Sequence, residues 1–487
     1  MAEFIIANMA PLMFGALVVF LLFGYPVAFA LAANGIVFGL IGIELGLLTP
    51  ALFQALPERI FGIMANDTLL AIPFFTFMGL VLERSGMAED LLDTIGQLFG
   101  PMRGGLAFAV IFVGALLAAT TGVVAASVIS MGLISLPIML RYGYDKRLAA
   151  GVIAASGTLA QIIPPSLVLI IMADQLGRSV GDMYEGAMVP GLVLTALYVG
   201  YVAMLAVFKP SSAPALPPEA RTLRGAKLML RVITTLVPPL VLIFLVLGTI
   251  FLGIATPTEG GAMGAAGALI LAIARKRLSF KLLKQAMETT GKLSSFVVFI
   301  LVGSTVFGLV FRGVNGDLWV EHLLLGLPGG QAGFLIVVNI LVFFLAFFLD
   351  FFELSFIIVP LLAPVADKLG IDLIWFGVLL AVNMQTSFMH PPFGFALFYL
   401  RSVAPASIKT TDIYWGAIPF VCIQIIMVAL IIIFPNIVSY GDPAEKARLE
   451  QQGDVDLSTM MQDGDATQAP TEDSAADLLK NLQSENK

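Results

Sequence analysis

The sequence predicts an all-α polytopic membrane protein made of two inverted repeats, each with five spans, an interfacial arm helix and a re-entrant hairpin. The first observation is composition, because the 487-residue chain is 59% hydrophobic and only 12% charged, whereas soluble domains carry roughly 25% charged residues. The second is a series of apolar segments long enough to cross a bilayer. The third is a correspondence between the two halves of the chain.

Ten apolar segments have the length and low charge expected of membrane spans. They cover residues 6–23, 27–48, 68–83, 147–173, 186–208, 232–252, 257–274, 293–311, 373–399 and 413–435. Two mixed segments, between Leu48 and Asn66 and between Lys276 and Lys292, predict interfacial helices. The first apolar run lacks a basic n-region, so we interpret it as a span and not as a cleavable signal peptide.

Two stretches, 106–140 and 331–366, are apolar throughout but interrupted near their centres. The interruptions read "ATTGVVAAS" at 119–127 and "LDFFELS" at 349–355. Each half has about 14 residues, fewer than the roughly 20 that a crossing needs, so both stretches are predicted to be re-entrant hairpins. Such backbone is tolerated at membrane depth only where it is buried in protein or lines a wet cavity.

Matching sequence segments occur in the same order in the two halves of the chain. The proline pair at 164–165 matches the pair at 391–392 at an offset of 227 residues, and "MYEGAM" at 183–188 matches "IYWGAI" at 413–418 at an offset of 230. Because five spans are an odd number, the second repeat begins on the opposite face of the membrane and is inverted. The predicted organisation is a first repeat at 1–209, a cytoplasmic linker at 210–231, a second repeat at 232–439 and an acidic polar tail at 440–487.

The basic residues support this topology. Before the tail, every Lys and Arg falls on one predicted side of the membrane except Arg59, Arg178, Arg312 and Lys368. Cytoplasmic loops carry the excess of basic residues, so the basic side is predicted to be cytoplasmic. Both termini are then predicted to lie outside, with the first hairpin entering from the cytoplasm and the second from outside.

Each proline pair interrupts a predicted span, 147–173 or 373–399, because proline lacks a backbone N–H and clashes with the preceding helical turn. Inverted-repeat transporters place substrate and ion sites where such broken helices meet. Oxygen-rich surroundings with no sulfur and little histidine suit a hard cation such as Na⁺. The polar groups at the breaks and hairpin tips are Thr120, Thr121, Gly122, Ser127, Ser156, Gly157, Thr158, Gln161, Asp350, Glu353, Ser355, Asn383, Gln385, Thr386 and Ser387.

Some of these features have a simpler interpretation. A lone proline usually means a kink, whereas a pair at matched positions of both repeats favours a functional break. Asp350 and Glu353 either belong to an ordinary solvated turn, or line the cavity, cap the returning helix or hold a cation. His390 is interpreted as a local hydrogen-bonding residue, with a proton carrier as the alternative. The small residues of "GIATPTEGGAMGAAG" (253–267) predict close helix packing, with a direct substrate role for Thr258 or Glu259 as the alternative.

The sequence excludes some classes of membrane protein and favours others. The sequence contains no G-x-x-x-x-G-K-[ST] motif and no soluble segment large enough for an ATPase, so an ion gradient or a partner would supply the driving force. A secondary transporter is the leading hypothesis. An ion channel is an alternative, because re-entrant loops also build selectivity filters. A membrane enzyme is a weaker one, since the sequence shows no paired His/Asp metal motif and Asp350 with Glu353 alone gives little support for catalysis.

Four separated segments resemble a known family. They are "LLAIPFFTFMG" (69–79), "GTLAQIIPPS" (157–166), "GIATPTEGGAMGA" (253–265) and "GIDLIWFGVLLAVNMQTSFMHPPFGFALF" (370–398). Together they resemble the large, DctM-like membrane subunit of TRAP (tripartite ATP-independent periplasmic) transporters, over residues 1 to about 440. The resemblance implies an elevator-type member of the ion transporter superfamily that imports an organic acid with Na⁺ through the bacterial inner membrane.

The resemblance also implies partners and residue roles, and no enzymatic activity or organic cofactor. The partners are a small four-helix membrane subunit and a periplasmic substrate-binding protein, and a self-sufficient sodium:carboxylate symporter is the alternative. The sodium ligands are expected at each hairpin tip and the adjacent broken helix, namely Ser127, Gly157, Thr158, Pro164, Asp350, Glu353, Asn383, Thr386 and Pro391. The expected substrate ligands are Thr120, Thr121, Gly122, Gln161, Gln385 and Ser387. The substrate could be a 2-oxo acid, a C4-dicarboxylate or a sugar acid.

Overall fold

The computed structural model describes residues 2–121, 124–392 and 394–441, and within them it is helical and contains no strand. Residues Met1–Ser439 form one compact unit, and the tail from Tyr440 is a second unit. The α-helices are α1 (Ala2–Ala7), α2 (Met9–Leu22), α3 (Val27–Glu44), α4 (Leu56–Met64), α5 (Asp67–Arg84), α6 (Met87–Phe99), α7 (Gly105–Thr121), α8 (Val124–Arg141), α9 (Lys146–Thr158), α10 (Leu167–Leu176), α11 (Val180–Phe208), α12 (Gly225–Phe251), α13 (Pro257–Ala274), α14 (Phe280–Gly313), α15 (Gly316–Leu325), α16 (Gly330–Leu345), α17 (Phe351–Ile357), α18 (Val359–Lys368), α19 (Leu373–Met384), α20 (Phe395–Val403) and α21 (Thr410–Ile433). The 3₁₀ helices are η1 (Pro50–Ala55), η2 (Leu159–Gln161), η3 (Pro210–Ser212), η4 (Pro218–Ala220), η5 (Gln385–Phe388) and η6 (Pro435–Ile437).

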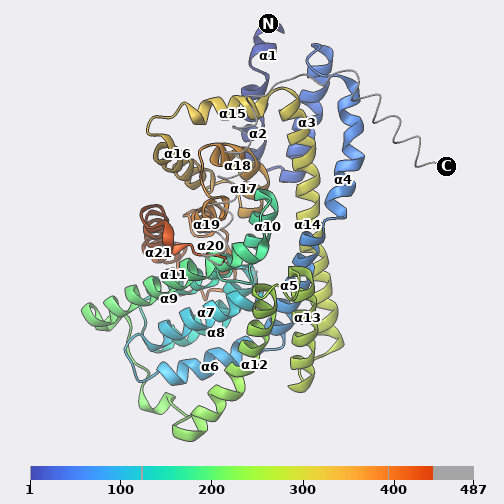
Figure 1. Ribbon diagram of the computed structural model, residues 1–487. Helices are drawn as coiled ribbons and strands as arrows, with labels where there is room; N and C mark the ends of the chain where they lie inside the picture. Colours follow the sequence, from blue (N-terminus) through green and yellow to red (C-terminus); the bar gives the residue numbers. More distant parts are fainter. Residues whose placement is uncertain (1, 122–123, 393, 442–487) are drawn as a thin grey trace, which may run out of the picture. The chain divides into compact units, whose positions relative to one another are not determined.

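Seven helices of the described chain are long and apolar enough to cross a membrane, or nine if each of two bent pairs is one span. Five of the predicted spans correspond to α3, α11, α12, α13 and α21 (Figure 1). The halves of the first predicted hairpin are longer than expected, because α7 has 17 residues and α8 has 18. The expectation that each half is too short to cross is therefore wrong for α8, since Pro137 is accommodated inside this helix. The re-entrant path itself stays a prediction.

The predicted interfacial helix at 276–292 and the predicted span at 293–311 are one continuous helix, α14, of 34 residues. Their counterparts in the first half are separate, because a bend of 46° lies between the η1–α4 segment and α5. At this bend the Asn66 side chain accepts a hydrogen bond from the Thr68 backbone N–H at 2.9 Å and starts α5. The prediction of two elements around α14 is corrected to one, since the helix runs through Gly291 without such a cap.

Two helices, α6 and α15, were not predicted from the sequence, and each precedes a predicted hairpin. Helix α6 begins after Gly86, which has a φ of 73°, and carries Glu89 and Asp90 in its first turn. Carboxylates there interact favourably with the helix dipole. Asp90 also pairs with Arg277 at 2.9 Å, which ties α6 to the segment after α13.

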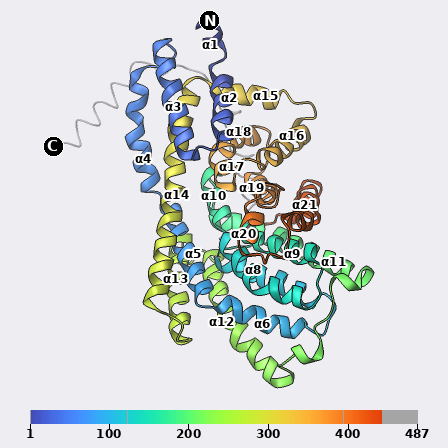
Figure 2. The same cartoon turned by 180° about the vertical axis from the view of Figure 1, so that it is seen from behind.

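The helices of the two halves pack crosswise (Figures 1 and 2). Helix α3 packs against α14 while α5 packs against α13, and α9 packs against α21 while α11 packs against α19. In the repeat correspondence, α3 matches α13, α5 matches the second part of α14, α9 matches α19 and α11 matches α21. Each contact therefore has a reciprocal counterpart, as in an interface related by two-fold symmetry. The inverted repeat stays a prediction, and these contacts support it.

Small residues allow close approach between the helices, as predicted for 253–267. A Cβ atom on Gly264 of α13 would lie 2.5 Å from the Met78 sulfur of α5. A Cβ atom on Gly303 of α14 would lie only 2.4 Å from the carbonyl oxygen of Ala28 in α3. The prediction of close packing along 253–267 is confirmed, because even a Cβ atom at Gly264 would displace the Met78 side chain.

The linker between α11 and α12 lies against the base of the α7–α8 pair. The Asp145 backbone N–H donates to the Ser212 carbonyl at 2.9 Å. The Tyr144 hydroxyl accepts from the Leu106 backbone N–H at 3.1 Å. Burial raises the pKa of Tyr144 to about 12, so this hydroxyl stays protonated at physiological pH.

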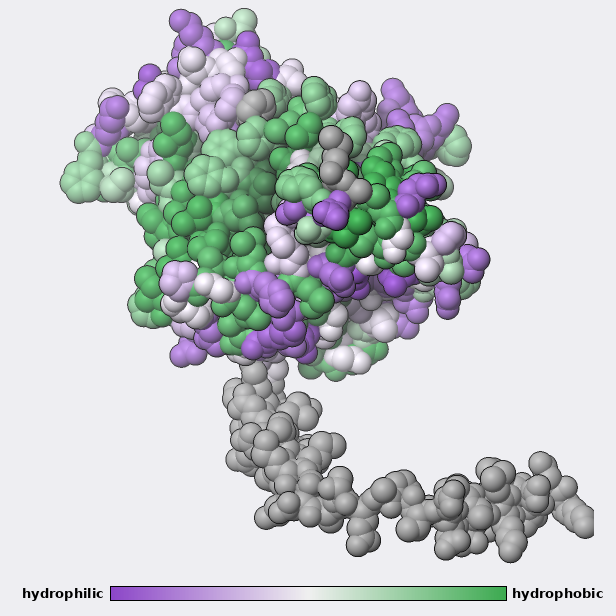
Figure 3. Space-filling view, turned by 90° about the horizontal axis from the view of Figure 1, so that it is seen from above, coloured by the Kyte–Doolittle hydropathy of each residue, from purple (hydrophilic) through white to green (hydrophobic). Residues whose placement is uncertain are grey.

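Large apolar side chains cover much of the surface, as Figure 3 shows for the face seen from above. Phe208, Leu252 and Phe280 are 83%, 75% and 82% exposed. Contiguous apolar surface of this extent is unfavourable in water and is covered in a lipid bilayer.

Candidate functional site

Both predicted broken helices are interrupted at their proline pairs. Helix α9 ends at Thr158 and α10 begins at Leu167, with the short turn η2 between them. In the second half α19 ends at Met384 and α20 begins at Phe395, with η5 between them. The peptide bonds Pro164–Pro165 and Pro391–Pro392 are both cis. The breaks are thus built in the same way in the two halves.

A tyrosine supports each break from the following helix. The Tyr184 hydroxyl of α11 donates to the Ser166 carbonyl oxygen at 3.3 Å. The Tyr414 hydroxyl of α21 donates to the Pro392 carbonyl oxygen at 3.2 Å. A carbonyl freed from a helix at membrane depth needs such a partner. The matched Tyr-x-Gly-Ala segments therefore have matched structural roles.

The two breaks meet through one hydrogen bond between the halves. The Gln385 Nε2 atom donates to the Thr158 hydroxyl at 3.0 Å. These residues are 227 positions apart, which is the offset that relates the two proline pairs. Residues in equivalent positions touch each other where a two-fold axis would pass. The structure thus brings two predicted ligands from different halves together.

Several oxygen atoms at this meeting point are buried without a hydrogen-bond partner among the described residues. They are Gln161 Oε1, Gln385 Oε1 and Ser387 Oγ. An unpartnered buried oxygen costs free energy that a bound ligand can recover. Two are amide acceptors and one is a hydroxyl, which fits either a hard cation or a hydrogen-bond donor on a substrate. All three were predicted as substrate ligands.

Other predicted ligands already have internal partners. The Thr158 hydroxyl donates to the Ala155 carbonyl at 2.8 Å, and the Thr386 hydroxyl donates to the Asn383 carbonyl at 2.7 Å. The Asn383 Nδ2 atom donates to the side-chain oxygen of Asn339 on α16 at 2.9 Å. These bonds leave hydroxyl lone pairs available, and they hold the ends of α9 and α19 in place.

Each predicted hairpin tip lies against the break of its own half. A Cβ atom on Gly157 would lie 2.3 Å from a methyl carbon of Val128, so α8 passes directly over the end of α9. The Ser355 hydroxyl of α17 lies 3.8 Å from the Met384 sulfur at the end of α19. Ser127 is buried at the start of α8. The side chains of Thr120 and Thr121, and all of Gly122, lie outside the described part of the chain.

Asp350 and Glu353 cap the returning helix of the second hairpin. The Glu353 backbone N–H donates to Asp350 Oδ1 at 3.0 Å, and the Asp350 backbone N–H donates to Glu353 Oε2 at 2.9 Å. This reciprocal pair is a capping box at the start of α17. Of the predicted interpretations, the structure shows capping for both residues and cavity lining for Asp350. It also places two carboxylates side by side, and Asp350 lines a cavity.

That cavity has a volume of about 330 Å³ and lies between both breaks, both hairpin tips and α14. Among the described residues, its polar lining residues are Gln161, Asp350 and Tyr399, and the others are apolar, including Phe296 and Phe388. A volume of this size accommodates a small organic molecule. Tyr399 and Phe296 were not predicted, because aromatic residues are abundant in this sequence and neither residue belongs to a polar cluster.

The His390 side chain packs among aromatic residues. Its ring stacks on Phe347 with the centroids 4.2 Å apart and meets the edge of Phe343 at 4.4 Å. Ala346, next to Phe347, offers a backbone hydrogen-bond partner to the ring. The interpretation as a local hydrogen-bonding residue therefore stays a prediction.

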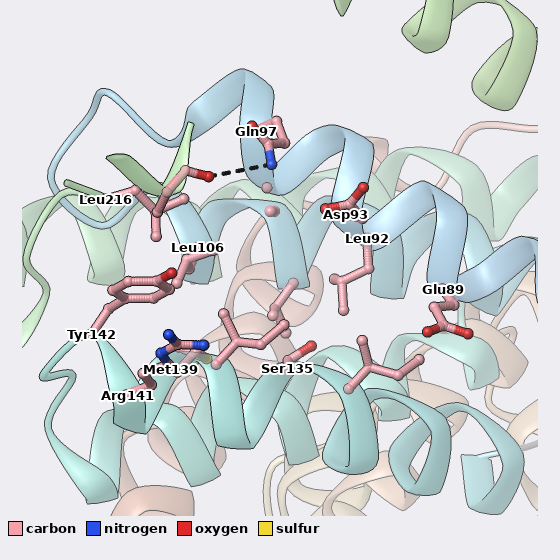
Figure 4. A pocket seen from close by; sticks show the side chains of 16 residues that line it. Glu89, Leu92, Asp93, Gln97, Leu106, Ser135, Met139, Arg141, Tyr142 and Leu216 are labelled. Carbon is pink, nitrogen blue, oxygen red and sulfur yellow. Dashed lines mark hydrogen bonds between the residues drawn. The ribbon is translucent and has the colours of Figure 1, made fainter. Parts of the chain in front are cut away.

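A separate cavity of about 350 Å³ lies between α6, α7, α8 and the linker (Figure 4). Glu89, Asp93 and Arg141 are among its lining residues. Gln97 also lines this cavity, and its Nε2 atom donates to the Ala220 carbonyl at 3.4 Å. None of the predicted ligands that the structure describes lines this cavity.

Paired broken helices, apolar surface and a cavity at the breaks define a multi-pass membrane transporter rather than an enzyme. The chain belongs to the family described as "Tripartite ATP-independent periplasmic transporter, DctM component", whose model matches residues 14–437. The resemblance noted from four sequence segments is therefore confirmed.

Individual relatives and one solved structure are also similar to this chain. A C4-dicarboxylate TRAP transporter large permease protein DctM of Pseudomonas aeruginosa is 29% identical over 80% of this chain and 90% of its own length. A sialic acid TRAP transporter large permease protein SiaM of Vibrio cholerae is 27% identical over 85% of this chain and 93% of its own. The crystal structure of the Alcanivorax borkumensis YdaH transporter matches with a TM-score of 0.52 at 15% identity, over 78% of this chain and 88% of its own.

Proposed function

We propose that this chain is the large permease subunit of a sodium-driven transporter that imports an organic acid. The observation that carries the proposal is the set of unpartnered buried oxygens, Gln161 Oε1, Gln385 Oε1 and Ser387 Oγ, where the two breaks meet. Family membership supports a transporter, and the names of the relatives supply organic acids as the substrate class.

The residues at the breaks and tips fit a hard cation. Sodium would be held by carbonyl, hydroxyl and carboxylate oxygens at Ser127, Gly157, Thr158, Pro164, Asp350, Glu353, Asn383, Thr386 and Pro391. A bound Na⁺ would supply positive charge next to an anionic substrate. The Asn383–Asn339 and Gln385–Thr158 hydrogen bonds orient the polar groups, while Phe296 and Phe388 exclude water from the cavity.

The crosswise contacts favour an inverted-repeat mechanism. The hairpins, the broken helices, α11 and α21 would form a mobile transport domain, and the remaining spans and arm helices a scaffold. Movement of the transport domain against the scaffold would expose the site to each side of the membrane in turn, as in elevator-type transporters. Because both breaks lie in the same domain, one movement would carry both sites.

The proposed partners are a separate small four-helix membrane subunit and a periplasmic substrate-binding protein. The word "large" in the names of the relatives and the printed name DctMQ of an isethionate relative support a small counterpart. The proposed location is the bacterial inner membrane with both termini in the periplasm, on the basis of the distribution of basic residues.

Reconstitution tests the proposal directly. Proteoliposomes would contain this chain and the small subunit, with an inward Na⁺ gradient, radiolabelled organic acids and the binding protein outside. We expect uptake that requires both Na⁺ and the binding protein. Uptake with Na⁺ alone would instead show a self-sufficient symporter, and substrate-free, non-saturating conductance would show a channel.

The double variant Asp350→Asn/Glu353→Gln separates capping from cation binding. Asn is a good N-cap and Gln can complete a capping box, so the folded state should lose less than about 1 kcal/mol. If the carboxylates hold Na⁺, the half-saturating Na⁺ concentration for uptake should rise about tenfold or more, because a charged ligand is lost. Asp350→Ala is the comparison that removes the cap. Unchanged Na⁺ dependence in the double variant would leave these residues with a capping role only.

A further inference from the structure

A third cavity, distinct from the two described above, also lies away from the breaks. We propose that it is an outer anion-binding site. It would hold a carboxylate of the transported acid before the acid reaches the breaks. The inference rests on the proposed function and on the predicted topology. The cavity has a volume of about 360 Å³ and lies between α4 and α14 on one side and α10, α17 and α18 on the other.

The cavity collects polar groups from segments far apart in the sequence. Arg59 comes from α4, Arg312 from the end of α14, and Asp174 and Gln175 from the end of α10. All of these residues are predicted to lie on the outer side of the membrane. Ser304 of α14 closes the inner wall, where its hydroxyl donates to the Phe356 carbonyl at 2.6 Å. A concave site with a few convergent polar groups is the usual form of a small-molecule site.

The charges point to an anion. Of the four basic residues on the predicted outer side, Arg178 pairs with Asp367 at 3.8 Å and Lys368 pairs with Glu321 at 2.6 Å. The other two, Arg59 and Arg312, both line this cavity. Neither has an acidic partner within 4.0 Å in the part of the chain that the structure describes.

The acidic residue in the cavity, Asp174, lies more than 4.0 Å from both guanidinium groups and forms no ion pair with them. Asp174 accepts one hydrogen bond from Asn66 Nδ2 at 2.6 Å and another from Gln175 Nε2 at 2.9 Å. Both carboxylate oxygens are thus bonded to neutral amides, and two guanidinium groups remain. A planar guanidinium binds a carboxylate through two parallel hydrogen bonds, so an organic acid matches the free groups in charge and geometry.

The position of the cavity suits a site on the inward path. Helix α10 has 10 residues and begins directly after the first break, so its cavity end is about 15 Å from that break. Elsewhere the predicted outer side carries exposed carboxylates such as Glu44 and Glu259, which repel an acid. The cavity would therefore concentrate the anion near the site at the breaks.

Uptake kinetics test the proposal in the reconstituted complex with its small subunit and binding protein. Arg59→Gln and Arg312→Gln should each raise the KM for the acid about tenfold and leave kcat within about twofold. Lys at either position should restore part of the affinity. Arg178→Gln is the matched control, because it removes the same charge from the same predicted side outside the cavity. Equal KM values for all three Gln variants would overturn the proposal.

A thiol-accessibility experiment gives a readout that does not depend on uptake. Cys422 is the only cysteine, so Cys422→Ala provides a clean background for Gly62→Cys. Gly62 lines the cavity, and a Cβ atom there meets nothing within 4 Å. An anionic methanethiosulfonate (ethylsulfonate) should react faster than a cationic one (ethyltrimethylammonium). Arg59→Gln/Arg312→Gln should lower this rate ratio about tenfold, and Arg178→Gln should not.

Protection distinguishes the possible occupants. Saturating organic acid should slow modification of Gly62→Cys in liposomes of zwitterionic lipid. Protection by anionic phospholipid and not by the acid would show a lipid site and overturn the proposal. If the wild-type complex shows no Na⁺-dependent uptake while the acid still protects the thiol, the proposed function fails and the anion site stands. If the wild-type complex shows normal Na⁺-dependent uptake but the thiol shows no charge selectivity, the anion-site proposal fails and the proposed function stands.

Discussion

Gly416→Ala is expected to prevent correct assembly of the protein, because α9 and α21 touch through their backbones. A Cβ atom on Gly416 would lie 2.1 Å from the carbonyl oxygen of Arg147, and a Cβ atom on Gly151 would lie 2.1 Å from the carbonyl oxygen of Gly416. Carbon and oxygen atoms cannot approach so closely, so the helices must separate along their length. We expect a loss of more than about 3 kcal/mol for either alanine variant.

The measurement is the yield of monodisperse protein after size exclusion in detergent, together with its thermal unfolding temperature. Gly200→Ala is the matched control, because Gly200 lies within α11 and a Cβ atom there meets nothing within 4 Å. This control should be neutral, or stabilising by up to about 1 kcal/mol. A Gly416→Ala protein as stable as the control would show that the two helices tolerate separation.

The repeat-equivalent glycine provides a second comparison. A Cβ atom on Gly186 would meet the side-chain ends of Ile374 and Val438 at 3.1 Å. Side-chain ends can rotate away, whereas a backbone carbonyl cannot. Gly186→Ala should therefore cost less than Gly416→Ala, even though both glycines occupy the same place in the Tyr-x-Gly-Ala segments.

Gln385→Leu is expected to abolish most transport while the protein remains folded. The variant removes the bond to Thr158, a structural loss of about 1 kcal/mol. It also removes Gln385 Oε1, one of the unpartnered buried oxygens. If that oxygen contacts the cation or the substrate, its loss should cost about 3 kcal/mol, or roughly 100-fold in uptake.

Asn34→Leu is the matched control for Gln385→Leu. Asn34 is fully buried in α3, its Nδ2 atom donates to the Met13 carbonyl at 3.1 Å, and its Oδ1 atom has no hydrogen-bond partner among the described residues. Both variants lose a similar amide, but only Gln385 lies at the breaks. The comparison would measure initial uptake rate and half-saturating Na⁺ concentration at equal amounts of folded protein. Similar values for the two variants would remove Gln385 from the proposed site.

Much of the helical plan follows from the local sequence. Apolar length predicted α3, α11, α12, α13 and α21, and the proline pairs marked both breaks, because hydrocarbon length and the missing proline N–H act locally. The capping box of Asp350 and Glu353 was also visible as a D-x-x-E pattern. Capping was one of four interpretations of these two residues, since a sequence does not show which groups are near a carboxylate.

Other features depend on neighbours that are distant in the chain. The continuity of α14, the length of α8 and the presence of α6 and α15 were missed, because a helix continues or stops according to the partners that cover it. The aromatic surroundings of His390 come from α16 and the residues after it. The outer cavity combines Arg59 and Arg312, which nothing in the local sequence connects.

The sequence by itself determined a chain of apolar spans with two matched broken helices, and it made a membrane transporter the leading hypothesis, which family membership confirms. Only the tertiary structure decided that the breaks meet through Gln385 and Thr158, that three nearby oxygens lack hydrogen-bond partners among the described residues, and that Gly151 and Gly416 bring two backbones together. The physical reason is the distance along the chain over which each effect acts. Hydropathy, proline and capping act within a few residues, whereas the pairing of polar groups depends on how helices more than 200 residues apart in the chain pack.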